Sequence, residues 1–301
     1  MIFRSNGKLL LSGEYFILNG SKAIGLPCKK GQILKIEPNT KTPNIIWETW
    51  DENENLIMHA NFDKDNLKFI NGKINKLHLN HLIKILNYLK KISPICFKFP
   101  IKIYTKIEFN INWGLGSSST LINNLSKWAK INPYKFLQNS FGGSGYDIAC
   151  ANSEKPILYQ IKKNSRSIKK KKFNPEFLGN LYFIYLNKKQ NSRNEIKKFL
   201  KIQKPSSLLI DSISEISEKM IESKNQKEFN FLINQHEQII SKHLNKITIK
   251  KKIFNDFDGE IKSLGAWGGD FILASSLRKD INKYFKKLGY YTIFKYADLI
   301  K

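Results

Sequence analysis

The stretch NWGLGSSST, residues 112–120, decides the fold, because it joins two kinds of hydrophobic pattern. Before it, Ile101 and Ile103 alternate with polar residues, which predicts a strand; after it, Leu121 and Leu125 recur at helical spacing. Glycines let a backbone turn approach an anion closely, and the open N–H groups at the start of a helix point toward that anion. The order strand, glycine turn and helix therefore predicts a phosphate-binding site, with a helix cap that binds no ligand as the alternative.

The residues that we expect to contact phosphate are the six of this turn: Gly114, Leu115, Gly116, Ser117, Ser118 and Ser119. Serine hydroxyls at this position can cap the helix or reach a magnesium ion. The turn is not a Walker A loop, because GxxxxGK[ST] is absent, and it lacks the third glycine of a dinucleotide-binding fingerprint. The local pattern thus predicts anion binding without specifying the ligand.

Outward from this turn, the chain shows both structural periods. The first forty residues alternate and carry glycine turns, which predicts short strands, and polar segments with scattered aromatic residues over 39–76 are compatible with more strands. Helical spacing predicts helices near 77–91, 206–223 and 226–245. Further strands are expected at 181–186 and 290–294. We expect a mixed α and β protein with two lobes, residues 1–172 and 173–301, and a functional site between them.

Composition limits the class of protein. The chain has 301 residues, of which 41% are hydrophobic and 25% charged, as in globular proteins that bury a sizeable core. No apolar run approaches the length of a membrane span, and the N-terminal residues offer no cleavage site of a signal peptide. We therefore expect a cytoplasmic protein without membrane association.

The net charge of +26 raises the question of a nucleic-acid partner. Of the 51 basic residues 47 are lysines, whereas recognition of bases and phosphates favours arginine. The abundance of lysine, asparagine and isoleucine is also typical of codon drift in an A- and T-rich genome. The densest basic tract, residues 162–172, is expected to be a solvated loop between the lobes, and a polyanion-binding tract is the alternative.

Cysteine and histidine give little support for a metal centre. Cys28, Cys96 and Cys150 fit neither a disulfide framework nor paired metal ligands, so we expect buried free thiols. The histidines include no HExxH pattern. His236 lies on an apolar helical stripe and is expected to be a hydrogen-bonded core residue.

Four segments together resemble the signature set of the GHMP kinases, the superfamily of galactokinase, homoserine kinase, mevalonate kinase and phosphomevalonate kinase. They are SNGKLLLSGEYFILNGSKAIGLP (5–27), NWGLGSSST (112–120), SGYDIA (144–149) and KSLGAWGGDFILA (262–274), in the order of that superfamily. The GYDIA sequence is similar to one branch in particular. The resemblance implies an α+β, two-lobed fold: an N-terminal lobe like ribosomal protein S5 domain 2, which binds ATP, and a ferredoxin-like C-terminal lobe.

The resemblance also implies roles for single residues. The phosphates of ATP would lie under residues 114–119, and Ser117 or Ser118 would help hold Mg²⁺ on them. Asp147 would be the catalytic carboxylate, and Lys8 would stabilise charge at the acceptor oxygen, which suits phosphoryl transfer because this reaction needs positioning and cations more than covalent help. The family's third motif is GAWGGD (265–270), within the last of the four segments. It would support the phosphate loop and the substrate through Gly265, Gly268, Gly269 and Asp270. For Glu14 a structural hydrogen bond within its turn is expected rather than catalysis.

The acceptor is expected to be a small molecule of isoprenoid precursor synthesis, with phosphomevalonate ahead of mevalonate. The third motif ends in aspartate, and Phe136 stands where mevalonate kinases tend to place a magnesium-binding glutamate. A phosphorylated acceptor needs extra cations, for which Lys188, Ser192 and Arg193 are candidates; a solvated helix start is the alternative for them. Trp113 and Trp267 replace small residues of the family and raise the possibility of reduced activity or an altered acceptor.

Four other functions stay open at this stage. The chain could be a mevalonate kinase, another GHMP kinase or a decarboxylase of the superfamily. A function of another class is a basic protein that binds RNA or another polyanion without catalysis. The sequence does not indicate an oligomeric state.

Overall fold

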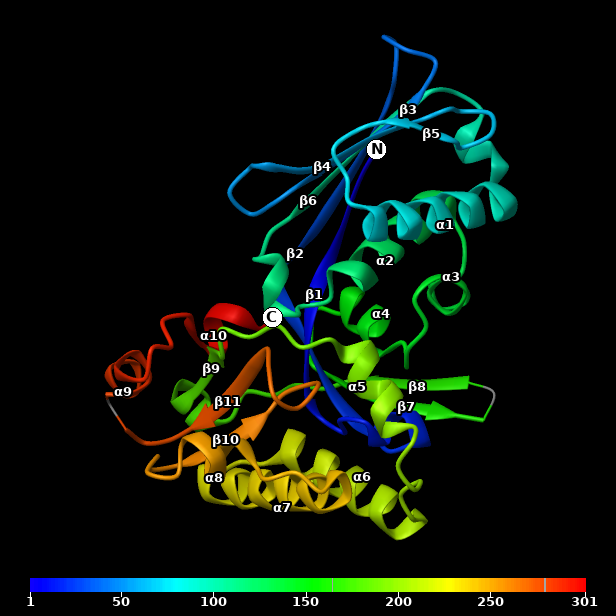
Figure 1. Ribbon diagram of the computed structural model, residues 1–301. Helices are drawn as coiled ribbons and strands as arrows, with labels where there is room; N and C mark the ends of the chain where they lie inside the picture. The colour runs from blue at the N-terminus through cyan, green and yellow to red at the C-terminus, as the bar shows by residue number, and fades with distance from the viewer. Residues whose placement is uncertain (164, 279) are drawn as a thin grey trace. The chain divides into compact units, whose positions relative to one another are not determined.

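The computed structural model describes residues 1–163, 165–278 and 280–301, and it describes Arg193 without its side chain. The chain forms two compact units (Figure 1). Unit 1 comprises Met1–Gly7, Lys30–Ile111 and Leu115–Asn152, and unit 2 comprises Lys8–Lys29, Asn112–Gly114 and Ser153–Lys301. The chain thus passes between the units several times, and the expected division into lobes at residue 172 stays a prediction.

Two long strands carry the chain between the units. They are β1 (Ile2–Ser12) and β2 (Ala23–Pro38), which pair with each other. Residues 23–25 of β2 pair with β7 (Ile157–Lys162) in unit 2, and residues 32–38 pair with β6 (Ile101–Ile107) in unit 1, both antiparallel. Strands are thus confirmed over the first forty residues, but they are long, with 11 and 16 residues, and not short as predicted.

The strands of unit 1 continue from β6 in the order β3 (Ile45–Trp50), β4 (Leu56–Phe62) and β5 (Phe69–Asn71). The pairing of β3 with β6 is parallel, and that of β3 with β4 is antiparallel. In β6 the sequence IKIYTKI alternates between buried isoleucine or threonine and partly buried polar positions, as a strand with one covered face requires. The strands expected between residues 39 and 76 are therefore present.

The helices of unit 1 lie on one side of these strands (Figure 1). They are α1 (Lys76–Ile92), α2 (Ser117–Ala129), α3 (Pro133–Ser140) and α4 (Tyr146–Ala151), with short 3-10 turns at Pro94–Phe97 and Ile111–Trp113. Leu82, Leu86 and Leu89 of α1 are buried at helical spacing, and Asn75 caps the helix by accepting a hydrogen bond from the N–H of His78. These leucines share one apolar core with Ile122 of α2.

Unit 2 contains an antiparallel sheet with strand order β10-β11-β9-β12. The strands are β9 (Leu181–Tyr185), β10 (Glu260–Ser263), β11 (Phe271–Ser275) and β12 (Ile293–Lys295). The strand predicted at 181–186 is confirmed, whereas the last strand begins three residues later than the predicted 290–294. The reason is that Gly289 takes a positive φ of 85° and the N–H of Tyr290 donates back to the carbonyl oxygen of Phe285, so the chain is still in the turn that ends α9.

Two antiparallel helices of unit 2, α6 (Ser207–Glu222) and α7 (Gln226–Leu244), pack side by side (Figure 1). Their bounds agree with the predicted helices at 206–223 and 226–245. Shorter helices complete the unit: α5 (Ser192–Phe199), α8 (Ile249–Ile253), α9 (Ile281–Lys287), α10 (Tyr296–Leu299) and 3-10 turns at Phe16–Asn19 and Glu176–Asn180. None of the described helices is both long and apolar enough to cross a bilayer.

The prediction that the basic tract, residues 162–172, is a loop is wrong. Instead of a loop, it forms most of a hairpin in which β8 (Ser165–Lys170) pairs antiparallel with β7 along its whole length; Asn164 lies outside the described residues. Five of the six side chains of β8 are exposed. Its backbone groups are satisfied by β7, so lysine side chains can stay in solvent while the strand forms, and charge on a strand of this kind discourages edge-to-edge association.

Candidate active site

The predicted phosphate loop forms the start of α2. Gly114 and Gly116 have φ values of 68° and 89°, so both adopt the left-handed conformation that favours glycine. Gly116 is the N-cap of α2 and makes no side-chain cap hydrogen bond, so no cap side chain occupies the N–H groups of the first turn. Ser117 and Ser118 are half-buried in this turn. The segment therefore has the geometry of an anion site at a helix N-terminus.

Asp147 lies beside this loop in unit 1. It stands in the first turn of α4, directly after Gly145 and Tyr146, and Gly145 has a φ of 86°. The hydroxyl of Ser119 donates a hydrogen bond to Oδ2 of Asp147 at 3.1 Å. The structure thus brings together two residues that the sequence analysis placed in one site, from segments 28 positions apart.

The third motif contributes Asp270 in unit 2. Asp270 has a φ of 53°, is 8% exposed, and accepts a hydrogen bond at Oδ1 from the backbone N–H of Gln190 at 3.0 Å. Its carboxylate lies against Gly114, where an added Cβ would come within 2.4 Å of Oδ2. The third motif and the first glycine of the phosphate loop are therefore in direct contact.

Charge around Asp270 comes from two lysines of unit 2. Burial raises the pKa of the Asp270 carboxyl, while the hydrogen bond from Gln190 and the charges of Lys8 and Lys189 lower it. The balance is a raised pKa. Lys8, predicted to be catalytic, lies on β1 and acts electrostatically on this carboxylate. Nothing in the sequence alone indicates that Lys8 and Asp270 interact.

The candidates for substrate binding lie on the segment that follows β9; they are Lys188, Ser192 and Arg193. The N–H of Asp270 donates to the carbonyl oxygen of Lys188 at 2.7 Å, and the side-chain amide of Gln190 donates to the carbonyl oxygen of Trp267 at 3.0 Å. Ser192 is exposed at the start of α5, and the side chain of Arg193 lies outside the described residues. The structure therefore fixes this segment on the third motif, where Lys188 is exposed.

The glycines of the third motif serve two purposes. Gly265 and Gly268 have φ values of 65° and 102°. At Gly269 the conformation is ordinary, but an added Cβ would lie 2.8 Å from the carbonyl oxygen of Lys188. Gly269 is thus required for the close approach of two backbone segments, and the other two for the turn itself.

The three aromatic departures from the family pattern are packing residues. Trp267 is 4% exposed and shares an apolar cluster with Phe16 and Phe199, while its backbone N–H donates to the hydroxyl of Tyr15 at 3.2 Å. The ring of Trp113 packs edge-on against Phe294, with 5.2 Å between the ring centroids. In unit 1 Phe136 is fully buried and stacks on Tyr88, with the ring centroids 5.0 Å apart.

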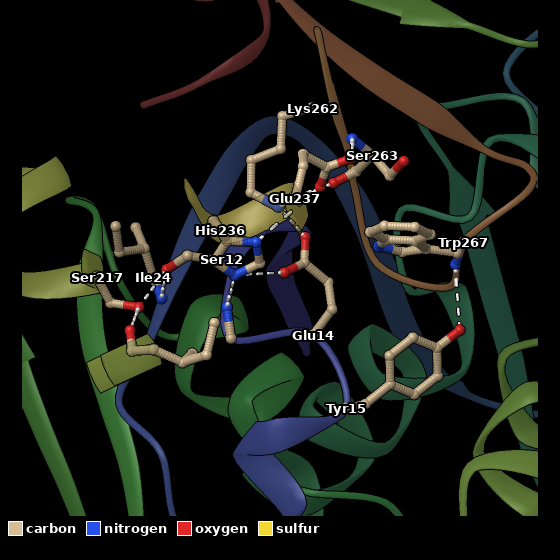
Figure 2. Close-up of polar contacts among 12 residues, drawn as sticks. Ser12, Glu14, Tyr15, Ile24, Ser217, His236, Glu237, Lys262, Ser263 and Trp267 are labelled. Carbon is tan, nitrogen blue, oxygen red and sulfur yellow. Dashed lines mark hydrogen bonds and ion pairs between the residues drawn. The ribbon is translucent and has the colours of Figure 1, made fainter. Parts of the chain in front are cut away.

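A buried charged cluster that the sequence does not reveal lies in unit 2 and includes residues of the first and last of the four segments (Figure 2). It consists of Glu14, His236, Glu237 and Lys262. Lys262 Nζ donates to Glu14 Oε1 at 2.6 Å, so the expectation that Glu14 bonds within its own turn is wrong. His236 is fully buried, as expected, and its Nε2 accepts a hydrogen bond from the N–H of Gly13 at 3.0 Å. The only sequence signal for Glu237 is a charged residue on an apolar stripe.

The comparisons with known proteins concern the fold of the whole chain. The fold matches that of a Methanococcus jannaschii mevalonate kinase, with 20% identity, a TM-score of 0.71 and coverage of 98% of this chain and 96% of that one. A Streptococcus pneumoniae phosphomevalonate kinase, solved with phosphomevalonate and AMPPNP, matches with 16% identity, a TM-score of 0.70 and coverage of 99% and 96%. A Lactococcus lactis galactokinase solved with galactose matches with 13% identity, a TM-score of 0.64 and coverage of 97% and 92%.

At the level of sequence alone, no protein-family model matches the chain and no curated protein is similar to it. The structural neighbours are kinases of the GHMP superfamily, and they match nearly the whole chain. The α+β architecture inferred from the four motifs is confirmed. This chain has the GHMP kinase fold.

Proposed function

We propose that the chain is an ATP-dependent kinase that transfers the γ-phosphoryl group to a mevalonate-pathway intermediate, with phosphomevalonate favoured over mevalonate. The observation that carries the proposal is the hydrogen bond between Ser119 and Asp147 at the start of α2. It unites an anion-binding helix start with a carboxylate that can accept or orient the proton of an acceptor. The fold of the neighbouring kinases supports the same reading.

The residues of the loop fit the phosphates of a nucleoside triphosphate. Residues 114–119 would hold its phosphates through the backbone N–H groups of the first turn of α2, and Gly114 and Gly116 leave room for that approach. The half-buried hydroxyls of Ser117 and Ser118 would help hold Mg²⁺. When bound, Mg²⁺ neutralises charge on the phosphates and orients them for in-line transfer.

Asp147 and Lys8 would act on the acceptor. Asp147 would orient the acceptor oxygen, and Lys8 would stabilise the charge that develops on it. A phosphate acceptor has a second pKa of about 6, so it is largely ionised at neutral pH and Asp147 would orient more than deprotonate it. Preference for such an acceptor is supported by the lysines near the third motif, Lys188 and Lys189, since an additional anion needs additional cations.

An acceptor panel tests the proposal. Purified protein with Mg·ATP is offered phosphomevalonate, mevalonate, galactose and homoserine, and acceptor-dependent ADP release is measured together with CO₂ release. We expect turnover with phosphomevalonate, slower turnover with mevalonate and no CO₂. Turnover with galactose or homoserine alone would assign another GHMP kinase activity, and CO₂ release would assign a decarboxylase. If no acceptor gives ADP release above background, the proposed kinase activity is wrong.

A polyanion-binding function is the second candidate, and the exposed basic side chains of β8 favour it. Such binding would weaken steeply as salt rises, because neutralised phosphates release their counterions. Fluorescence titration with single-stranded RNA at low and high ionic strength measures this slope. Weak RNA binding that does not change between the two salt concentrations would eliminate this candidate.

For the proposed kinase, we expect a cytoplasmic location, which follows from the proposed substrates.

A further inference from the structure

The buried cluster of unit 2 joins both motif-bearing segments of that unit (Figure 2). Glu14, His236 and Lys262 are 0% exposed and Glu237 is 3% exposed. Glu14 follows β1, His236 and Glu237 are neighbours on α7, and Lys262 lies on β10 directly before the third motif. Removing ionised groups from water is costly unless their charges are balanced, so the protonation of this cluster is constrained.

The ion-pair geometry assigns the lysine to one glutamate. Lys262 Nζ lies 2.6 Å from Glu14 Oε1 but 3.4 Å from Glu237 Oε1, and it also donates to the carbonyl oxygen of Ser263 at 3.1 Å. Lys262 and Glu14 therefore balance each other. If Glu237 were ionised and His236 neutral, the cluster would hold a net buried charge of about −1. One additional proton on His236 or Glu237 would remove that charge.

The hydrogen bonding of His236 decides between these two places. The N–H of Gly13 points at Nε2 of His236 at 3.0 Å, so Nε2 presents its lone pair and the proton of the ring is on Nδ1. A second ring proton would have to sit on Nε2, where Glu14 Oε2 lies 3.1 Å away, and it would compete with the Gly13 N–H. A neutral imidazole keeps the Gly13 hydrogen bond, which leaves Glu237 as the place for the additional proton.

We propose that Glu237 holds a proton in the folded protein and, as a neutral acid, positions the turn at Gly13 and the end of β10 at Ser263, which leads into the third motif. The contact with Ser263 is direct, because its N–H donates to Glu237 Oε2 at 3.2 Å. The effect on Gly13 is indirect: a neutral Glu237 leaves Lys262 with Glu14 and leaves His236 free of a second proton. Glu237 is thus a positioning residue, and the inference holds whether or not phosphoryl transfer occurs.

The direction of the electrostatic shifts agrees. Burial raises the pKa of Glu237 from its ordinary value of 4.5 to about 7, with Lys262 opposing and Glu14 reinforcing the rise. Burial lowers the pKa of His236, and Lys262 lowers it further, against the opposite effect of Glu14. Burial raises the pKa of Glu14 and the charge of Lys262 lowers it; the balance is a lowered pKa. Glu14, His236 and Lys262 are thus the titratable groups that face Glu237, and they come from the turn after β1, from α7 and from β10.

The sign of the pH dependence follows from these directions. Glu237 binds its proton more tightly in the folded than in the unfolded chain, so its stabilising contribution is complete below pH 4.5 and is lost as pH rises to about 7. His236 acts in the opposite direction, since its contribution is complete above its ordinary value of 6.5 and is lost as pH falls. Total stability therefore cannot isolate Glu237, but a difference between two variants can.

The test compares wild type with Glu237→Gln, which imitates the neutral acid, and with Glu228→Gln, an exposed glutamate of the same helix. Urea unfolding is measured from pH 4.5 to 8. We expect the ratio of the wild-type unfolding constant to that of Glu237→Gln to rise with pH, by at most about tenfold per pH unit between 4.5 and 7. The ratio for Glu228→Gln is expected to stay constant. Parallel curves for wild type and Glu237→Gln would overturn the proposal.

Carbon and nitrogen NMR of the wild-type protein covers the case in which Glu237→Gln does not fold. We expect the carboxyl carbon of Glu237 to titrate near pH 7 and the ring nitrogens of His236 to report a neutral ring protonated at Nδ1. A Glu237 carboxylate already ionised at pH 5.5, or a doubly protonated His236 at pH 7, would contradict the assignment.

Discussion

The carboxylate of Asp270, in the third motif, lies so close to Gly114, in the phosphate loop, that a side chain at position 114 would collide with it. An added Cβ at Gly114 would stand 2.4 Å from Oδ2 and 2.5 Å from Cγ of Asp270. Asp270 itself holds a positive φ of 53°, a conformation that aspartate tolerates better than most residues. This contact joins the end of the third motif to the beginning of the phosphate loop.

Gly114→Ala should therefore be more harmful than an ordinary glycine substitution. The φ of 68° costs about 1–2 kcal/mol for a non-glycine residue, and the contact with Asp270 adds about 1–3 kcal/mol. Gly289→Ala is the matched control, because Gly289 has a φ of 85° but open space around it. Urea unfolding should show the larger loss for Gly114→Ala, and Asp270→Gly should restore part of it. Equal losses in both alanine variants would mean that the contact is unimportant.

Asp147→Asn should lower turnover by about 10²-fold or more, because an amide can neither orient a phosphate acceptor as the carboxylate does nor accept the proton of a hydroxyl acceptor. The hydrogen bond from Ser119 can persist with the amide oxygen, so the fold should be retained. Steady-state kinetics with the preferred acceptor measures the effect, and Asp211→Asn on the exposed face of α6 serves as the control. Unchanged turnover in Asp147→Asn would remove this carboxylate from the mechanism.

Lys262→Met should destabilise the protein by about 3–5 kcal/mol, because it leaves the carboxylate of Glu14 buried without its cation. The control is Lys219→Met, which breaks an exposed pair with Glu215 on α6 and should have no measurable effect on stability. Thermal or urea unfolding measures both variants. A tolerated Lys262→Met would show that the pair with Glu14 is not needed for stability.

Asp270→Asn should stabilise the folded chain near neutral pH. The raised pKa of Asp270 means that its contribution to stability is complete below pH 3.8 and is lost as pH rises through the raised value. The amide keeps an acceptor for the N–H of Gln190 and tolerates a positive φ. The midpoint of urea unfolding should thus increase at pH 7 and not at pH 3.5.

Lower activity should accompany that gain if Asp270 orients Lys8 for catalysis. Kinetics at pH 7 therefore complement the unfolding data for Asp270→Asn. A variant that is less stable than wild type at pH 7 would contradict the predicted cost of burying this carboxylate.

Trp267→Ala should cost about 3–5 kcal/mol of stability without increasing turnover per folded molecule. The indole is buried among apolar side chains, including Phe16 and Phe199, so its loss leaves a cavity. Trp267→Phe should recover most of the stability. Faster turnover in the alanine variant would show that this side chain restricts the reaction, as its departure from the family pattern suggested.

Much of the fold was predictable from local patterns. The helices α1, α6 and α7 and the strands β6 and β9 follow from apolar spacing, and the start of α2 follows from its glycines and serines. The basic tract was not predictable in the same way, because pairing with β7 overrides the low strand propensity of a lysine-rich segment. The late start of β12 likewise depends on the turn at Gly289.

The candidate site, too, was predictable only where the signal is local. By itself, the sequence determined which short segments carry anion-binding glycines, serines and carboxylates, because turn and helix signals are local. Only the tertiary structure decided that Ser119 bonds to Asp147, that Asp270 lies against Gly114 and that Lys262 is buried with Glu14. The last two residues are 248 positions apart, and no periodicity encodes a contact over such a distance. Whether a charged side chain is buried and paired or free in solvent is a property of packing, which the chain acquires only when distant segments meet.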